Sequence, residues 1–414
     1  MSQMLHKEIP YLSLFSGAGG LDLGLERAGF SPALCVENDE DSRQTIELNR
    51  PGWKLANPGD IHSLSGSQII KQLGIKQRKL PLLVGGPPCQ PFSKSGYWSS
   101  GDSLRLLDPR SKTVQAFLNA VEITLPKVVL LENVKGILYN KKDEGLRLIQ
   151  SAFKEINKRN QTQYIPYVFT LNAAAFGIPQ MRERVFVIAN IDGETFVPPL
   201  PTHGPESVVK KDFLTAWDAI GSYDKDNWPN ELNLSGRWAK LIPSIPEGYN
   251  YLWHTQRNGG EPLFGWRTRY WSFLLKLAKN RPAWTIQAEP GPATGPFHWK
   301  NRLLSIQELC ALQTFPKNYK ISGNRRSAVR QIGNAVPVAL GELLGLSVKN
   351  QFFNYDIEIK LTSLPKRRRD CPTSERTSKV PAEYLKLRGK HSDHPGVGLG
   401  PGILKRERRR PIEK

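Results

Sequence analysis

The chain has 414 residues, enough for two or three domains that each bury a core, and a formal net charge of +20 from 58 Lys and Arg against 38 Asp and Glu. A chain of this length needs no disulfide scaffold, and its four cysteines are far apart with no Cys-x-x-Cys spacing, which argues against a structural zinc. No apolar run approaches the roughly 18 residues that span a membrane, so we expect no membrane partner, a reducing cytoplasmic location and an attraction to polyanions.

Apolar segments alternate with amphipathic segments over the first 190 residues, as is typical of strands that alternate with helices. Strands are predicted at 12–15, 34–37, 82–84, 128–131, 167–172 and 185–189, with helical patterns at 21–28 and 113–124. Further along, 302–316 carries apolar residues at helical spacing up to Pro316, and 331–344 is expected to return to the sheet. The order predicts an α/β fold with a doubly wound sheet.

A glycine-rich turn, FSGAGG at 15–20, follows the first predicted strand and leads into a helix. The second strand ends at Glu37, where a doubly wound sheet places an acid that binds ribose hydroxyls. A Gly-x-Gly-x-x-Gly fingerprint would need glycine at position 22, where Asp22 stands. The turn therefore favours a nucleoside over a pyrophosphate.

A thiol follows the third strand in the run GGPPC at 85–89. The glycines allow a close approach of ligand and the prolines remove conformational freedom before Cys89, as suits a nucleophile. The alternative is a small buried hydrophobe in a turn. Glu132 follows the fourth strand, on the sheet edge where open α/β sheets bind ligands, and its alternative is a carboxylate that caps a loop.

Five motifs occur in the order typical of DNA cytosine carbon-5 methyltransferases, which the sequence resembles over roughly residues 11–345. They are FSGAGG at 15–20, GPPCQ at 86–90, ENV at 132–134, QMRER at 180–184 and GNAVP at 333–337. The resemblance, to the bacterial restriction-modification type, implies a Rossmann-like methyltransferase domain that uses S-adenosylmethionine, plus a smaller target-recognition domain. It also implies double-stranded DNA as substrate, a cognate restriction endonuclease that acts on the same site, and a nucleoid-associated cytoplasmic protein. We expect a monomer.

The resemblance assigns catalytic roles to Cys89, Glu132, Arg182 and Arg184. Cytosine carbon 5 is a poor nucleophile, so a thiolate must first add to carbon 6, and Cys89 would take this role on a base flipped out of the duplex. Glu132 would supply a proton or strong hydrogen bond to ring nitrogen 3. Arg182 and Arg184 alternate, so we expect both to point to the ligand side of a strand, with a structural ion pair as the alternative.

The same resemblance implies that eight residues bind S-adenosylmethionine: Phe15, Gly17, Gly19, Gly20, Glu37, Asp60, Ile61 and Asn334. Glu37 would hold the ribose hydroxyls and Asp60 would meet the adenine amino group. Asn334 would complete the pocket from the far end of the chain. The mechanism requires no metal, and no cluster of ligands suggests one.

Three regions are predicted: a discontinuous catalytic domain at 1–195 and 325–350, a target-recognition domain at 196–324, and a basic tail at 351–414. Eight of the ten tryptophans lie between 217 and 299, which predicts both aromatic packing and a DNA-reading surface. The tail holds sixteen Lys or Arg against eight Asp or Glu, and we expect it to be mostly disordered, with either no role or a non-specific affinity for DNA.

Two other functions compete with a DNA methyltransferase. One branch of the family acts on transfer RNA and carries a Cys-Phe-Thr signature, but no cysteine here is followed by Phe-Thr. The other is a catalytically silent DNA-binding protein, which the intact Cys89, Glu132 and glycine turn make improbable.

Overall fold

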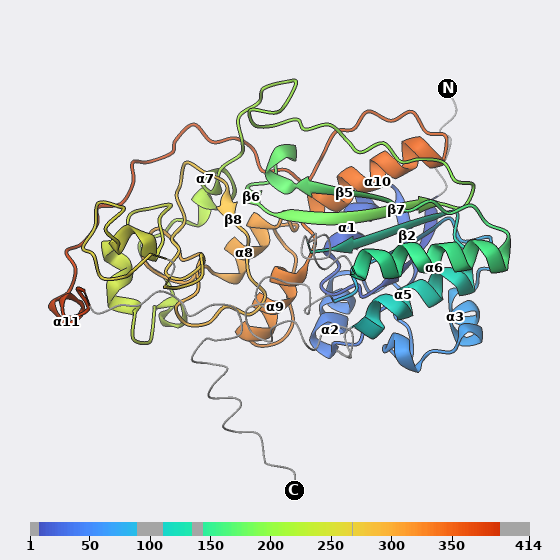
Figure 1. Ribbon diagram of the computed structural model, residues 1–414, viewed down its shortest axis with the longest axis horizontal. Coiled ribbons are helices and arrows are strands. Elements are labelled where there is room, and N and C mark those ends of the chain that lie inside the picture. The colour runs from blue at the N-terminus through green and yellow to red at the C-terminus, as the bar shows by residue number, and fades with distance from the viewer. Residues whose placement is uncertain (1–7, 89–110, 135–143, 267, 390–414) are drawn as a thin grey trace, which may run out of the picture.

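A six-stranded sheet forms the centre of the computed structural model, which describes residues 8–88, 111–134, 144–266 and 268–389 (Figure 1). The strand order is β2-β1-β3-β4-β7-β5. The strands are β1 (Ile9–Leu14), β2 (Phe30–Val36), β3 (Leu82–Gly85), β4 (Val128–Asn133), β5 (Tyr167–Asn172) and β7 (Glu183–Asn190). The first four are parallel, and β7 runs antiparallel to both β4 and β5. All six predicted strands are present, so the α/β prediction is confirmed.

Helices cover both faces of this sheet because the strand side chains alternate between two apolar clusters. One face packs against α3 (Gly66–Leu73), α5 (Ser111–Thr124) and α6 (Glu144–Asn160). The other packs against α1 (Gly20–Arg27) and α10 (Val338–Phe352). A Cβ atom at Gly24 would overlap with the backbone of α10, so glycine lets α1 and α10 approach closely.

The chain order reverses at β1, which pairs with β2 on one side and with β3 on the other. In an open α/β sheet, a ligand binds at such a switch point, beyond the carboxyl ends of the strands. The carboxyl ends of β1, β2, β3 and β4 all lie at this edge. The glycine turn follows β1, Glu37 follows β2, Pro87-Pro88 follow β3, and Glu132 is the penultimate residue of β4.

The region after β7 contains little regular structure. Within its described residues it holds α7 (Ala216–Ile220), β8 (Ala283–Trp284), α8 (Ile306–Leu312) and several 3₁₀ turns. β8 pairs with β6 (Gln180–Met181), next to the six-stranded sheet. A separate apolar cluster, with Trp238 packed against Phe264 and Phe273, forms the core of the part farthest from the sheet (Figure 1). The predicted helix at 302–316 is shorter than expected, because a Ser305–Glu308 capping box starts it late.

The chain then returns to the sheet through α9 (Arg325–Asn334) and α10, as was predicted for residues 331–344. The combined segment 325–352 is long and apolar enough to cross a membrane by composition alone. However, 89% of its apolar window is buried inside the protein, and Ala335 to Pro337 interrupt the helix. We conclude that it is a core element.

Residues 353–389, here named the strap, differ from the disorder predicted for the tail. The strap leaves α10, crosses the molecule and ends beyond α11 (Ala382–Leu385), at the end of the molecule that lies farthest from the sheet (Figure 1). A few widely spaced apolar and polar side chains of the strap contact the rest of the protein. The overall basic, proline-containing composition of the strap did not indicate these contacts. The rest of the tail, 390–414, lies outside the described residues. The predicted division into three regions stays a prediction.

Candidate active site

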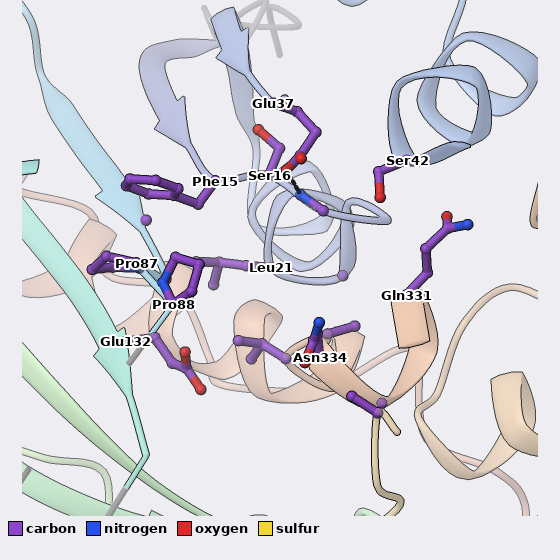
Figure 2. Close-up of a pocket in the computed structure, with 18 of the residues that line it drawn as sticks. Phe15, Ser16, Leu21, Glu37, Ser42, Pro87, Pro88, Glu132, Gln331 and Asn334 are labelled. Atoms are coloured by element: carbon purple, nitrogen blue, oxygen red, sulfur yellow. Dashed lines mark hydrogen bonds between the residues drawn. The ribbon is translucent and has the colours of Figure 1, made fainter. Parts of the chain in front are cut away.

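An open cavity of about 1850 Å³ lies at the carboxyl edge of the sheet. The loops after the first four strands line one side, and residues from β8 and the end of α9 line the other (Figure 2). Seven of the eight residues predicted to bind S-adenosylmethionine line this cavity, namely Phe15, Gly17, Gly20, Glu37, Asp60, Ile61 and Asn334, whereas Gly19 does not. The sequence therefore placed these residues around one space although they span most of the chain.

The glycine turn adopts backbone conformations that residues other than glycine rarely tolerate. Gly17 and Gly19 have φ angles of +55° and +74°, and a Cβ atom at Gly20 would overlap with the Val336 carbonyl. Gly19 is the residue before α1, and a Cβ there would approach Tyr319 at 3.3 Å. Phe15 also has a positive φ, of 58°, which turns the chain directly after β1. The turn thus brings backbone close to the cavity.

Glu37 anchors this turn from the end of β2. Its Oε2 accepts a hydrogen bond from Gly17 N at 2.7 Å, and its Oε1 accepts one from Asp39 N at 2.8 Å (Figure 2). Burial raises the pKa of Glu37, while these two backbone donors counteract the rise. Each carboxylate oxygen keeps a further lone pair for a ligand on the cavity side.

Asp22 is buried below the glycine turn, in the position where a dinucleotide fold would have glycine. It is 1% exposed, and its Oδ1 accepts a hydrogen bond from the Tyr11 hydroxyl at 3.1 Å. Burial raises the pKa of Asp22 to about 6, so the carboxyl group is partly protonated near neutral pH.

Asp60 and Asn334 approach the cavity from opposite ends of the sequence. The Asp60 side chain accepts a hydrogen bond from His62 N at 3.0 Å and thereby caps the 3₁₀ turn Ile61–Ser63. Asn334 is the last residue of α9, and its side chain is exposed at the cavity (Figure 2).

Glu132 and Arg184 form an ion pair in the cavity wall. Arg184 Nε lies 2.9 Å from Glu132 Oε1, and the two side chains are only 13% and 10% exposed. Burial raises the pKa of Glu132, although the positive charges of Arg184 and Arg182 oppose the rise. A Cβ atom on Gly86 would lie 3.0 Å from Glu132 Oε2, so glycine keeps this oxygen accessible beside the Pro87-Pro88 turn.

Two side chains hold the backbone that leads to Cys89. Asn133 Nδ2 donates to the Pro87 carbonyl at 3.3 Å, and Thr113 Oγ1 donates to the Pro88 carbonyl at 3.0 Å. Cys89 itself lies outside the described residues. Asn133 belongs to the ENV motif, whereas nothing in the sequence around Thr113 indicates this contact.

Arg182 does not share the direction of Arg184, contrary to the prediction. Its side chain is fully buried, and its guanidinium donates to the carbonyls of Ile286, Gly333 and Ala335 at 3.3, 2.8 and 2.9 Å. The alternation rule fails here because β6 ends at Met181 and β7 begins at Glu183, so Arg182 lies between two strands that belong to different sheets.

A pair of buried glutamines extends this arrangement, and the sequence did not identify Gln313. Gln180 Nε2 donates to Gln313 Oε1 at 3.1 Å, and Gln180 Oε1 accepts from Ile286 N at 3.1 Å. Gln313 Nε2 donates to the Ile332 carbonyl at 2.6 Å. The sequence signal that could have identified Gln313 is its position as a polar residue within an apolar segment, directly after α8. Together with Arg182, these side chains fix the cavity wall that carries Asn334.

Comparison with known proteins now identifies the family. The model for C-5 cytosine-specific DNA methylases matches residues 9–350. The chain belongs to this family. It is therefore a DNA cytosine-5 methyltransferase, of the kind found in type II restriction-modification systems.

Relatives of this methyltransferase match along most of its length. Type II methyltransferase M.SacI of Streptomyces achromogenes is 34% identical over 376 residues, which cover 84% of this chain and 94% of the relative. Type II methyltransferase M1.HphI of Haemophilus parahaemolyticus is 30% identical over 351 residues, which cover 82% and 86%. The solved structure of the Entamoeba histolytica methyltransferase EhMeth shares the fold, with a TM-score of 0.54 at 19% identity, and covers 83% of this chain and 99% of that one.

Proposed function

We propose that this methyltransferase flips a cytosine out of a short duplex site, adds Cys89 to carbon 6 and methylates carbon 5 with S-adenosylmethionine as the donor. The observation that carries the proposal is the convergence of three groups on one cavity. These are the glycine turn with Glu37, the Glu132–Arg184 pair, and the braced Pro87-Pro88 turn directly before Cys89.

The residues present fit S-adenosylmethionine. Its ribose requires an acceptor for two hydroxyls, and Glu37 offers buried carboxylate oxygens that already accept from backbone N–H groups on their other side. The positive φ angles of Gly17 and Gly19 let backbone approach a ligand closely. We propose that Phe15, Gly17, Gly19, Gly20, Glu37, Asp60, Ile61 and Asn334 hold the cofactor. When bound, it supplies an electrophilic methyl group carried on a sulfonium.

In the proposed chemistry, the Cys89 thiolate forms a bond to cytosine carbon 6, and the displaced electron pair moves toward ring nitrogen 3. Glu132 would place a proton there, which the raised pKa of its buried carboxyl group favours. After methylation, a base takes the carbon 5 proton, the electron pair left behind forms the 5,6 double bond as the Cys89 thiolate leaves, and the proton on ring nitrogen 3 returns to Glu132.

Arg184 and Arg182 would have different tasks. Arg184 orients the Glu132 carboxyl group through their 2.9 Å contact and presents the remaining donors of its guanidinium to the cytosine carbonyl. Arg182 would act as a positioning residue, because its guanidinium contacts carbonyls of the cavity wall. The catalytic role predicted for Arg182 is thereby replaced by a supporting one.

Flipping the base costs a few kcal/mol of stacking and pairing, which contacts to the flanking DNA must offset. The net charge of +20 favours such contacts with phosphates. We propose a monomer that works in the bacterial cytoplasm at the nucleoid, where it protects DNA from an endonuclease that recognises the same site.

The test is transfer of radiolabelled methyl from S-adenosylmethionine to duplex DNA and, in parallel, to transfer RNA, with bisulfite mapping of the product. We expect label in DNA that Cys89→Ala abolishes. Duplexes with 5-fluorocytosine at the mapped position should trap a covalent adduct with the wild-type protein but not with Cys89→Ala, since fluorine cannot leave as a cation. Label in RNA alone, or cofactor binding without any transfer, would refute the proposal.

A further inference from the structure

The strap (residues 353–389) follows the part of the chain that the family model matches, which ends at residue 350. It contributes side chains to two separate apolar cores. Phe353 and Leu361 pack against the core between the sheet and α10, whereas Tyr384 belongs to the core of the recognition region. Figure 1 shows the strap as an orange to red trace that connects these two ends of the molecule.

At the catalytic end, the strap satisfies a buried acid. Glu342 on α10 is 1% exposed. Its Oε1 accepts hydrogen bonds from Thr362 N and Oγ1 at 2.9 and 2.6 Å, and its Oε2 accepts from Ser363 N and Oγ at 3.2 and 2.7 Å. A buried carboxylate is costly unless it is hydrogen-bonded, so this interior glutamate depends on the strap.

At the recognition end, the strap completes a buried charge cluster. Lys279 Nζ, on a side chain that is 2% exposed, lies 2.7 Å from Glu247 Oε1 and 2.8 Å from Glu375 Oε1. Glu375 N also donates to Glu247 Oε1 at 2.8 Å. Glu375 thus holds the strap through both its side chain and its backbone.

The strap is also held by an aromatic contact farther along. The Tyr384 ring stacks on Trp238 with centroids 5.8 Å apart, and its hydroxyl donates to the Arg237 carbonyl at 2.7 Å. Between the two ends, Arg368 N donates to Asp218 Oδ1 at 2.6 Å. The anchors follow one another along the chain, so the strap is tied at its start, its middle and its end.

The described residues that line the active-site cavity include none from the strap. Any effect of the strap on the cavity must therefore pass through the arrangement of the parts that it joins. The proposed cofactor residues lie in loops and first helical residues beside the sheet, apart from Asn334 at the end of α9, while the recognition region sits at the other end of the strap.

We infer that the strap holds the target-recognition region at a fixed position relative to the catalytic sheet and thereby sets the affinity for duplex DNA. The inference rests on the proposed division of labour between these two regions. Without the continuous strap, the arrangement that fits DNA is only one of several that the free protein samples. The apparent dissociation constant for duplex DNA then equals the intrinsic constant divided by the fraction of protein molecules in the arrangement that fits DNA. Cofactor affinity stays unchanged because its site does not involve the strap.

The experiment cuts the strap without removing any residue. A specific protease site is inserted between Lys366 and Arg367, both exposed and located between the catalytic and recognition anchors. The same protein is assayed before and after cleavage. We expect cleavage to raise KM for duplex DNA at least fivefold, with kcat within twofold and an unchanged Kd for S-adenosylmethionine. An identical site after Gly389, beyond the last anchor, is the control, and its cleavage should leave KM unchanged.

Two further measurements make the outcome decisive. Binding of labelled duplex by Cys89→Ala protein, cut and uncut, tests the strap without methyl transfer, so failure of the proposed chemistry is distinguished from failure of this inference. Tyr384→Ala should free the end of the strap, seen as faster tryptic cleavage after Arg376 and Lys379, and should raise KM for DNA, whereas Tyr384→Phe should retain most of the affinity. An unchanged KM after cleavage, or after Tyr384→Ala with a released strap, would overturn the inference.

Discussion

Replacement of Arg182 and of Arg184 by lysine should separate a positioning arginine from a catalytic one. The Arg182 guanidinium donates to three buried carbonyls, two of them through the same Nη2 atom. Lysine keeps the charge, but its single nitrogen cannot reach acceptors on both Ile286 and the Gly333–Ala335 turn. Loss of one or two hydrogen bonds to a charged group, at about 1.5–3 kcal/mol each, predicts a destabilisation of about 1.5–6 kcal/mol for Arg182→Lys.

Arg184→Lys should behave in the opposite way. Its charge remains beside Glu132 and its side chain is 13% exposed, so the losses are the geometry of the pair and one hydrogen bond from Nη1 to the Glu183 carbonyl. We expect the free energy of unfolding to change by less than about 1 kcal/mol while kcat falls at least tenfold, because lysine lacks the planar fork that orients a carboxylate.

Urea unfolding followed by tryptophan fluorescence measures the stability of both variants, and methyl transfer at saturating DNA measures kcat. Cofactor binding adds a third comparison, since Arg182→Lys should weaken it by loosening the wall that carries Asn334. An Arg182→Lys protein that unfolds at the wild-type urea concentration but loses as much kcat as Arg184→Lys would show that Arg182 acts on the substrate after all.

Three further predictions concern pH, packing and DNA contact. The pKa of Asp22 is about 6 in the folded protein and 3.8 ordinarily, so the folded state binds the proton more tightly. The contribution of Asp22 to stability is therefore full below pH 3.8 and declines by about 3 kcal/mol as the pH rises through 6. Asp22→Asn should remove that decline in urea titrations between pH 4 and 8. Gly24→Ala should destabilise by about 1–3 kcal/mol through overpacking against α10, whereas Gly52→Ala, with open space around it, should not; equal urea midpoints would contradict this. Trp271 is 54% exposed, and its ring lies 5.4 Å from that of Trp284 in the cavity wall. Trp271→Ala should therefore weaken DNA binding by about 1–3 kcal/mol of base stacking in a titration with labelled duplex, and Tyr167→Ala, exposed on β5, should not.

Local sequence patterns were sufficient for the sheet and for most of the cavity wall. Buried strands read as short apolar runs, and a glycine turn or an acid at a strand end can occupy only one edge of a doubly wound sheet. For this reason the sequence alone predicts that Phe15, Glu37 and Glu132 lie at one site. Asn334 was grouped with them through the resemblance, since no local pattern links it to β1.

Contacts between segments that are distant in the sequence could not be predicted from such local patterns. Arg182 lies between two strands of different sheets, and its carbonyl partners come from residues more than a hundred positions away. The strap was expected to be disordered because a basic, proline-containing composition is common in unfolded chains. Its order depends on Glu342 and Lys279, whose burial is decided by tertiary packing and leaves no periodic trace in the sequence.

The pairing of α1 with α10 also has a consequence for biosynthesis. The apolar side chains Leu21 and Leu25 of α1 are covered by a helix that leaves the ribosome about 300 residues later, which at about 5–20 residues per second means a delay of roughly 15–60 s. During this interval the glycine turn lacks the Val336 backbone against which it packs. Nascent chains therefore remain without a finished cofactor pocket, and with an apolar helix face open to chaperones, until α10 has been synthesised.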